Sequence, residues 1–383
     1  MSKQRKFNAR ALFDGFLGHE DELKALFSTF DHTPPDPFTT EAACRVASED
    51  FGPADPLTVL FHQFHDLATP KGRDIIDAVA ASFAIGGDVP GGVVTHQRAA
   101  LWLWNADKDA FESAMDRLAA SGVHGGQIAL FPGQSAKTIA DPVAAVAAFE
   151  AQLNDNLKDW NGAESFKVHH YLDGSMLVIL VFCERTAEPR MELDHATKAV
   201  KTRIGRPVVQ DVLFYDQSTG ELEIEAGRPK HREILRNAFA VGVMGDDSFF
   251  PMEEHTRVLN LMKLRERGFA LPTRPGHSAS ITAIALKITV GGKQLSANFS
   301  ANRHDVVAAL RSLNSQGLLT SAVIRRLRIE LVLGTGRLDR KSIELSTPNG
   351  IKFNRASHVD TVFEYLRVWS LMEQVHVEGQ SAA

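Results

Sequence analysis

The densest group of positive charges lies near the end of the chain. Residues 325–331 read Arg-Arg-Leu-Arg-Ile-Glu-Leu, an alternation that is typical of a β-strand with one buried and one solvent-facing side. The aliphatic side chains from Leu327 onward share the buried side, and Arg326, Arg328 and Glu330 share the other. Arginines on the open side of a sheet can contact the phosphates of a nucleic acid.

More basic residues follow in the next turn and around the last hairpin, so a positive sheet face or rim is expected. The predicted nucleic-acid-binding residues are Arg325, Arg326, Arg328, Arg337, Arg340, Lys341, Lys352 and Arg355. The few aromatic residues nearby fit the core better than the surface, which favours contact with phosphates over stacking on bases. The alternative is a solvated basic face whose charge complements that of an acidic part of the same chain.

A second cluster combines carboxylates with a histidine around residues 246–255. A metal-dependent phosphodiesterase or nuclease needs several carboxylates that converge on its ions. The candidate metal ligands are Asp246, Asp247, Glu253 and His255. No lysine lies two residues after Glu223 or Glu225, where a nuclease would place one, and acids at the start of a helix explain Glu253 and Glu254 more simply. Metal-dependent hydrolysis is therefore an alternative to the binding role.

Three weaker patterns carry no chemistry by themselves. His62 and His65 are spaced to share a helix face, but the glutamate of a zinc protease motif is missing. The glycine-rich segment 86–92 precedes a predicted helix and could hold an anion, although it matches neither phosphate-binding fingerprint. No G-x-S-x-G nucleophile motif is present. The sequence thus predicts no catalytic residue and no cofactor, and it favours a non-enzymatic protein.

The composition is that of a globular, water-soluble protein. Of 383 residues, 44% are hydrophobic and 23% are charged, close to average usage. The longest apolar run, 176–183, is too short to cross a bilayer, and no signal peptide is recognisable, so a cytoplasmic location without membrane contact is expected. The only two cysteines, Cys44 and Cys183, exclude a disulfide framework or a four-thiolate zinc site.

The net charge of −5 hides an asymmetry along the chain. Residues 1–160 hold 13 Lys and Arg against 22 Asp and Glu, whereas residues 271–383 hold 14 against 8. The N-terminal part is therefore acidic and the C-terminal part basic. Such a division indicates either an anionic partner on the basic part or attraction between the two ends.

The first 160 residues carry the spacing of amphipathic helices. Residues 19–30, for example, place Leu23, Leu26 and Phe27 on one side. Helices are predicted at 19–30, 39–50, 55–67, 72–84, 95–105, 107–120 and 142–160, with one short strand at 127–131.

From residue 164 the apolar residues alternate with a period of two, which predicts strands and hairpins. Strands are predicted at 166–171, 176–183, 207–215 and 221–225, with helices at 194–204, 229–239 and 258–267. After the Pro- and Gly-rich segment 271–276, the predicted order is ββαβββα, with strands at 281–290, 294–300, 323–333, 342–346 and 351–354 and helices at 303–313 and 357–372.

These elements predict an α+β fold with a helical N-terminal part, a central antiparallel sheet with helices and a C-terminal ββαβββα unit. The expected domains are 1–160, 161–270 and 271–383. We expect a binding or regulatory subunit that holds DNA or RNA on the basic C-terminal sheet and contacts another protein through its helical part. A structural scaffold is the third hypothesis.

Overall fold

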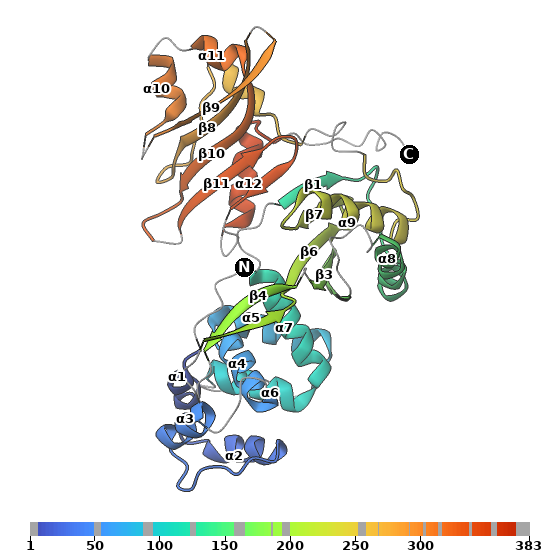
Figure 1. Cartoon of the computed structure of the whole chain (residues 1–383), viewed down its shortest axis with the longest axis vertical. Helices are drawn as coiled ribbons and strands as arrows, with labels where there is room; N and C mark the ends of the chain where they lie inside the picture. Colours follow the sequence, from blue (N-terminus) through green and yellow to red (C-terminus); the bar gives the residue numbers. More distant parts are fainter. Residues whose placement is uncertain are drawn as a thin grey trace. The chain divides into compact units, whose positions relative to one another are not determined.

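The structure is a computed structural model of the whole chain (Figure 1). It describes residues 7–49, 55–86, 95–122, 128–156, 165–184, 187–193, 200–251, 258–266, 268–290, 292–301, 304–312, 316–336, 339–353 and 358–372. The chain divides into two compact units, Ser2–Gly122 and Val123–Ala383. As the sequence predicted, the fold is α+β with a helical N-terminal part.

The first unit consists of helices in its described residues. They are α1 (Ala9–Asp14), α2 (Glu20–Thr29), α3 (Thr40–Glu49), α4 (Pro56–Leu67), α5 (Pro70–Ser82), α6 (His96–Ala106) and α7 (Lys108–Gly122). Asp55, Thr69 and Thr95 each cap a helix by accepting backbone amide hydrogen bonds, which explains where α4, α5 and α6 begin. The core is rich in phenylalanine, and Phe61 lies edge-on against Phe13.

The second unit is built on one long antiparallel sheet. Its strands are β1 (Ile128–Pro132), β2 (Phe166–Asp173), β3 (Met176–Glu184), β6 (Val208–Asp216), β7 (Glu221–Glu225), β8 (Ser278–Val290), β9 (Lys293–Ser300), β10 (Val323–Val332), β11 (Arg340–Ser346) and β12 (Gly350–Lys352). They pair in the order β2-β3-β6-β7-β1-β12-β11-β10-β8-β9. The short strand that the sequence predicted at 127–131 is therefore β1, and it joins the central strands to the C-terminal ones.

Helices pack on the two halves of this sheet. They are α8 (Pro142–Asn156), α9 (Pro229–Gly242), η2 (Leu261–Arg265, a 3-10 helix), α10 (Val306–Ser312), α11 (Gln316–Ser321) and α12 (Val359–Val368). The short helices α1 and α11 were not predicted, because six residues are too few to show helical periodicity. Within the described part of the chain, no helix has both the length and the apolar character needed to cross a membrane.

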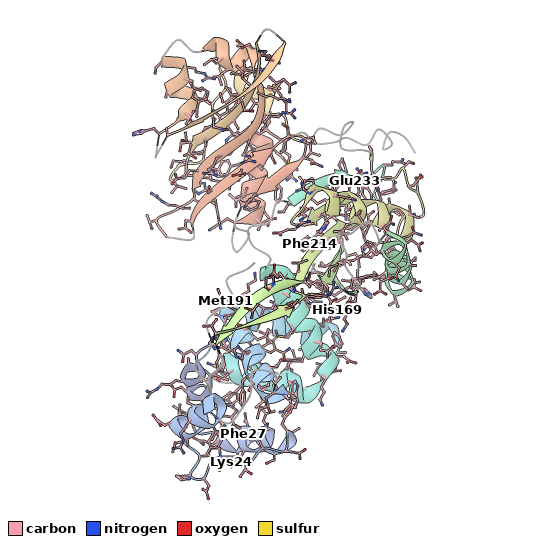
Figure 2. The ribbon with its side chains drawn as sticks, in the orientation of Figure 1. Lys24, Phe27, His169, Met191, Phe214 and Glu233 are labelled. Atoms are coloured by element: carbon pink, nitrogen blue, oxygen red, sulfur yellow. The ribbon has the colours of Figure 1, made fainter. Side chains whose placement is uncertain are left out.

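Residues 200–204 do not form the predicted helix. They belong to strand β5 (Val200–Gly205), which pairs with β4 (Glu188–Leu193) in a separate two-stranded ribbon. The β-branched residues Val200, Thr202 and Ile204 alternate along β5, and a period of two with β-branched side chains favours a strand. Met191 of this ribbon, labelled in Figure 2, is exposed.

Two hydrophobic cores lie along the sheet. The central core packs β3, β6 and β7 against α8 and α9. The C-terminal core packs one face of β8, β10 and β11 against η2, α10, α11 and α12. It also takes in Ile128 and Leu130 of β1 and Leu259, Leu261 and Leu264, which precede the predicted boundary at residue 271.

We predict that a fragment starting at residue 258 is more stable than one starting at 271. Leu259, Leu261 and Leu264 are each at most 1% exposed, and loss of a buried leucine costs about 2–5 kcal/mol. Urea unfolding of fragments 258–383 and 271–383 checks this, and the longer one should be more stable by more than about 3 kcal/mol. Equal unfolding midpoints would favour the predicted boundary at 271.

Glu221 of β7 is a partly buried carboxyl among other acids. It pairs across the sheet with Asp216. Burial, followed by the charge of Glu223, raises the pKa of Glu221 from 4.5 to about 7, although Arg367 acts in the opposite direction. The folded protein therefore keeps a proton that the unfolded chain releases, so this group lowers stability as pH rises from about 4.5 to about 7.

We therefore expect Glu221→Gln to raise the free energy of unfolding at pH 8 by about 1–3 kcal/mol and to change it little near pH 4.5. Glu233→Gln, at an exposed position on α9, is the matched control. Denaturant unfolding at both pH values measures the difference. A gain of equal size at both pH values would contradict the assignment.

Candidate nucleic-acid interface

In the described part of the chain, η2, α10, α11 and α12 pack on the same face of the C-terminal strands. Leu327, Ile329 and Leu331 of β10 are buried on the helix-covered face, as their alternation predicts. The opposite face of β8, β9, β10 and β11, called the open face below, carries the alternate residues. An antiparallel sheet tolerates one solvated face because polar side chains can occupy it.

Strand register arranges the open face in rows that cross the sheet. One row runs Asn298, Ala285, Arg326, Ser346 and Gly350, from β9 to β12. The next row runs Ser300, Ala283, Arg328, Glu344 and Lys352. Apart from the charged residues, these side chains are small or absent. The arginine side chains therefore project further from the sheet than their uncharged neighbours do.

A β-bulge adds a third arginine to this face. Ile324 pairs with Leu286 and Arg326 with Ala285, so Arg325 is an extra residue in β10. Its carbonyl accepts a hydrogen bond from the Thr347 amide at 3.2 Å. Simple alternation would turn Arg325 toward the core. The bulge leaves both Arg325 and Arg326 exposed.

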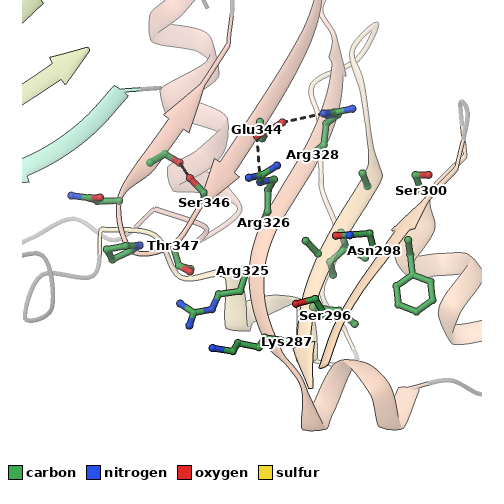
Figure 3. A pocket seen from close by; sticks show the side chains of 18 of the residues that line it. Lys287, Ser296, Asn298, Ser300, Arg325, Arg326, Arg328, Glu344, Ser346 and Thr347 are labelled. Atoms are coloured by element: carbon green, nitrogen blue, oxygen red, sulfur yellow. Dashed lines mark hydrogen bonds and ion pairs between the residues drawn. The ribbon is translucent and has the colours of Figure 1, made fainter. Parts of the chain in front are cut away.

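Glu344 forms ion pairs with two of the arginines. Its Oε2 lies 3.0 Å from Nη2 of Arg328, and its Oε1 lies 3.4 Å from Nε of Arg326. Figure 3 shows both contacts as dashed lines. The side chain of Arg326 is 60% exposed and that of Arg328 is 51% exposed, whereas that of Glu344 is 24% exposed. Glu344 therefore lies lower on the open face than the cations it pairs with.

These residues line a groove of about 760 Å³. Among the described residues that line it, the one carboxylate is that of Glu344, and the cationic side chains are those of Lys287, Arg325, Arg326, Arg328 and Arg232, of which Arg232 is 7% exposed. Pro229 and Arg232, at the start of α9, and the turn 347–350 form part of its lining. In Figure 3, Ser296, Asn298 and Ser300 extend along β9 beside it.

The other predicted basic residues lie away from the groove or outside the described residues. Arg340 is on the open face but pairs with Glu330, with Nη1 and Oε1 3.4 Å apart. Lys341 alternates to the opposite face and is 2% exposed, and burial lowers the pKa of its ammonium group. Lys352 is exposed on β12, next to Glu344 in register. Arg337 and Arg355 lie outside the described residues.

The candidate metal ligands are only partly described. Asp246 accepts hydrogen bonds from the amide and hydroxyl of Ser248, which lower the pKa of its carboxyl group. Asp247 is exposed. Glu253 and His255 lie outside the described residues. Among the residues that are described, no three or more His, Cys, Asp or Glu side chains gather as a metal site would require.

The weaker sequence patterns add no second site. His62 stacks on Phe7, with ring centroids 4.2 Å apart, and His65 is 3% exposed and lies edge-on against the same ring. Both histidines thus take part in aromatic packing. Most of the glycine-rich segment 86–92 lies outside the described residues.

Several groove residues were missed by the sequence analysis. Lys287 lies in β8 two residues after Ala285, and three polar residues, Ser296, Asn298 and Ser300, alternate along β9. This regular stripe of small polar side chains was a usable signal for an open sheet face. Arg232 had no such signal, because only the fold brings α9 to the C-terminal strands.

Neither the protein-family models nor the curated proteins compared with this sequence give a match.

Asn349 joins the two halves of the sheet beside the groove. Its side-chain Nδ2 donates to the backbone carbonyl oxygen of Leu130 at 3.0 Å. Its backbone carbonyl oxygen accepts from the Leu130 amide at 3.3 Å. Asn349 is 3% exposed. A buried side chain that bonds to backbone is costly to remove, because its partner stays unsatisfied.

We predict that Asn349→Ala lowers the free energy of unfolding by about 1–3 kcal/mol. Asn298→Ala, an exposed change on the open face, should alter it by less than about 0.5 kcal/mol. Chemical denaturation of both full-length variants distinguishes these effects. Equal stability of the two variants would show that the Asn349 contact does not hold the sheet together.

Proposed function

We propose that this protein is a non-enzymatic binding subunit that holds the phosphodiester backbone of nucleic acid on the open face of its C-terminal sheet. The observation that carries the proposal is the groove itself. Among its described lining residues, four cationic side chains of β8 and β10 and the largely buried side chain of Arg232 accompany one carboxylate. Clustered arginine and lysine supply sequence-independent affinity for phosphates by releasing counterions. Contact of the helical part with another protein and a cytoplasmic location stay predictions.

The chemistry of the groove lining favours backbone contact over base reading. Among the described residues that line the groove, Phe299 is the only aromatic one, and it packs against the C-terminal core. Stacking on bases needs exposed aromatic rings. Ser296, Asn298 and Ser300 instead offer hydroxyl and amide donors, which suit phosphate and sugar oxygens.

The test is the binding of the full-length protein to a fluorescent oligo-dT strand of about 20 nucleotides and to a duplex of the same length. Anisotropy is followed from about 50 to about 200 mM salt. We expect affinity to fall with salt, with a log–log slope of about −0.7 per phosphate contact on the single strand and about −0.9 on the duplex. Both probes should show the effect whatever their base sequence.

A charge-matched pair of variants localises the binding. Replacing Lys287, Arg325, Arg326 and Arg328 by Gln should weaken it by at least about tenfold near 50 mM salt. The control replaces by Gln one lysine and three arginines that are exposed outside the groove, namely Lys167, Arg10, Arg45 and Arg274. Equal loss in both variants would contradict a binding groove, and no salt-dependent binding by the wild type would favour the scaffold hypothesis.

A further inference from the structure

The cations of the groove differ in their partners. Arg326 and Arg328 share the carboxylate of Glu344. The side chains of Arg325 and Lys287 make no ion pair or hydrogen bond within the described part of the chain. Among the four cations on β8 and β10, one pair of arginines is therefore already neutralised in part, and the other pair of cations is not.

The two unpaired cations lie at the same end of the groove. In register, Lys287 is opposite Val323 and Arg325 is the bulge residue that follows Ile324. Figure 3 shows the side chains of Arg325 and Lys287 next to each other. Two like charges side by side repel each other, and an anion between them removes this repulsion.

Hydroxyl groups accompany these cations. Thr347, whose amide donates to the Arg325 carbonyl, also lines the groove. Its Oγ1 is buried and has no hydrogen-bond partner within the described part of the chain. Ser296 pairs with Lys287 across the β8–β9 ladder and lines the groove as well. This end thus combines two positive charges with the exposed hydroxyl of Ser296, and donors of this kind suit phosphate oxygens.

We propose that a nucleic-acid phosphate binds first between Arg325 and Lys287, the open subsite, and that Glu344 acts as an internal counter-ion that withholds Arg326 and Arg328, the paired subsite. This inference rests on the proposed function and adds that Glu344 limits the affinity of the groove for nucleic acid. A phosphate that approaches the paired subsite meets the charge of Glu344 and has to displace it from two arginines. Glu344 therefore weakens binding, although it lies among the binding residues.

The experiment is a mutant cycle in the full-length protein, measured by anisotropy with the oligo-dT strand. Glu344→Gln keeps the shape of the side chain and removes its charge, so it should tighten binding by about tenfold near 50 mM salt and steepen the salt slope by about two contacts. In the wild-type background, Arg326→Gln with Arg328→Gln should weaken binding by less than about threefold. The same two changes should abolish the gain in the Glu344→Gln background.

Removal of the open subsite should weaken binding more than removal of the paired subsite does. Lys287→Gln with Arg325→Gln should weaken binding by at least about tenfold in the wild-type background.

Glu330→Gln is the control for Glu344→Gln. It removes one carboxylate from the same face, and that carboxylate pairs with Arg340 outside the groove. It should leave affinity within about twofold.

Two results would overturn the inference while wild-type binding persists. One is a Glu344→Gln variant that binds no more tightly than wild type or than Glu330→Gln. The other is an equal loss from removing the paired and the open subsites in the wild-type background. Thermal unfolding of each variant shows that the fold is intact. Absence of salt-dependent binding by the wild type would instead overturn the proposed function, and this inference with it.

Discussion

The pairing of β1 with β12 is the contact on which the groove depends. Ile128 pairs with Ile351 and Ala129 with Gly350, and Asn349 adds hydrogen bonds to Leu130. This short seam makes one sheet of two halves that have separate hydrophobic cores. It places the start of α9 and the turn 347–350 at the border of the C-terminal strands, so residues far apart in sequence line one groove.

Electrostatic balance explains how so many cations occupy a small area of the sheet. Arg326 and Arg328 are adjacent on one strand face, and Glu344 lies opposite Arg328 in register. One carboxylate between two arginines reduces their mutual repulsion, although exposed pairs of this kind contribute little to stability. Arg325 and Lys287 lack this compensation within the described residues. The ion pairs of Glu344 thus reduce the repulsion on this face and also divide its cations into a paired and an unpaired subsite.

Local pattern was sufficient to predict much of the fold. Alternation in 325–331 identified which face of β10 is buried, and helical spacing identified α2 and most other long helices. Alternation failed at Arg325, because a bulge depends on pairing with β8 rather than on the strand's own sequence. Lys341 was predicted in the turn before a strand at 342–346, but it belongs to β11, where its register places it on the core face. At 200–204 β-branched residues formed a strand, where a helix was predicted.

The site was less predictable than the fold for a physical reason. The arginines of β10 stand out in the sequence, but the partner of Arg326 and Arg328 is on another strand. Likewise, the proximity of Lys287 to Arg325 follows from β8–β10 pairing, and the place of Arg232 follows from the seam between β1 and β12. Non-local contacts of this kind are set by the whole chain, so a single strand's pattern cannot specify them.

The most direct test of the binding groove is chemical footprinting of lysines in the full-length protein. Acetylation of Lys287 and Lys293 is measured by mass spectrometry with and without saturating oligo-dT. Both residues belong to the β8–β9 hairpin, but only Lys287 lines the groove. The proposed groove site requires that the oligonucleotide slow modification of Lys287 several-fold and leave Lys293 nearly unchanged. An unchanged rate at Lys287 when the strand is bound would contradict it.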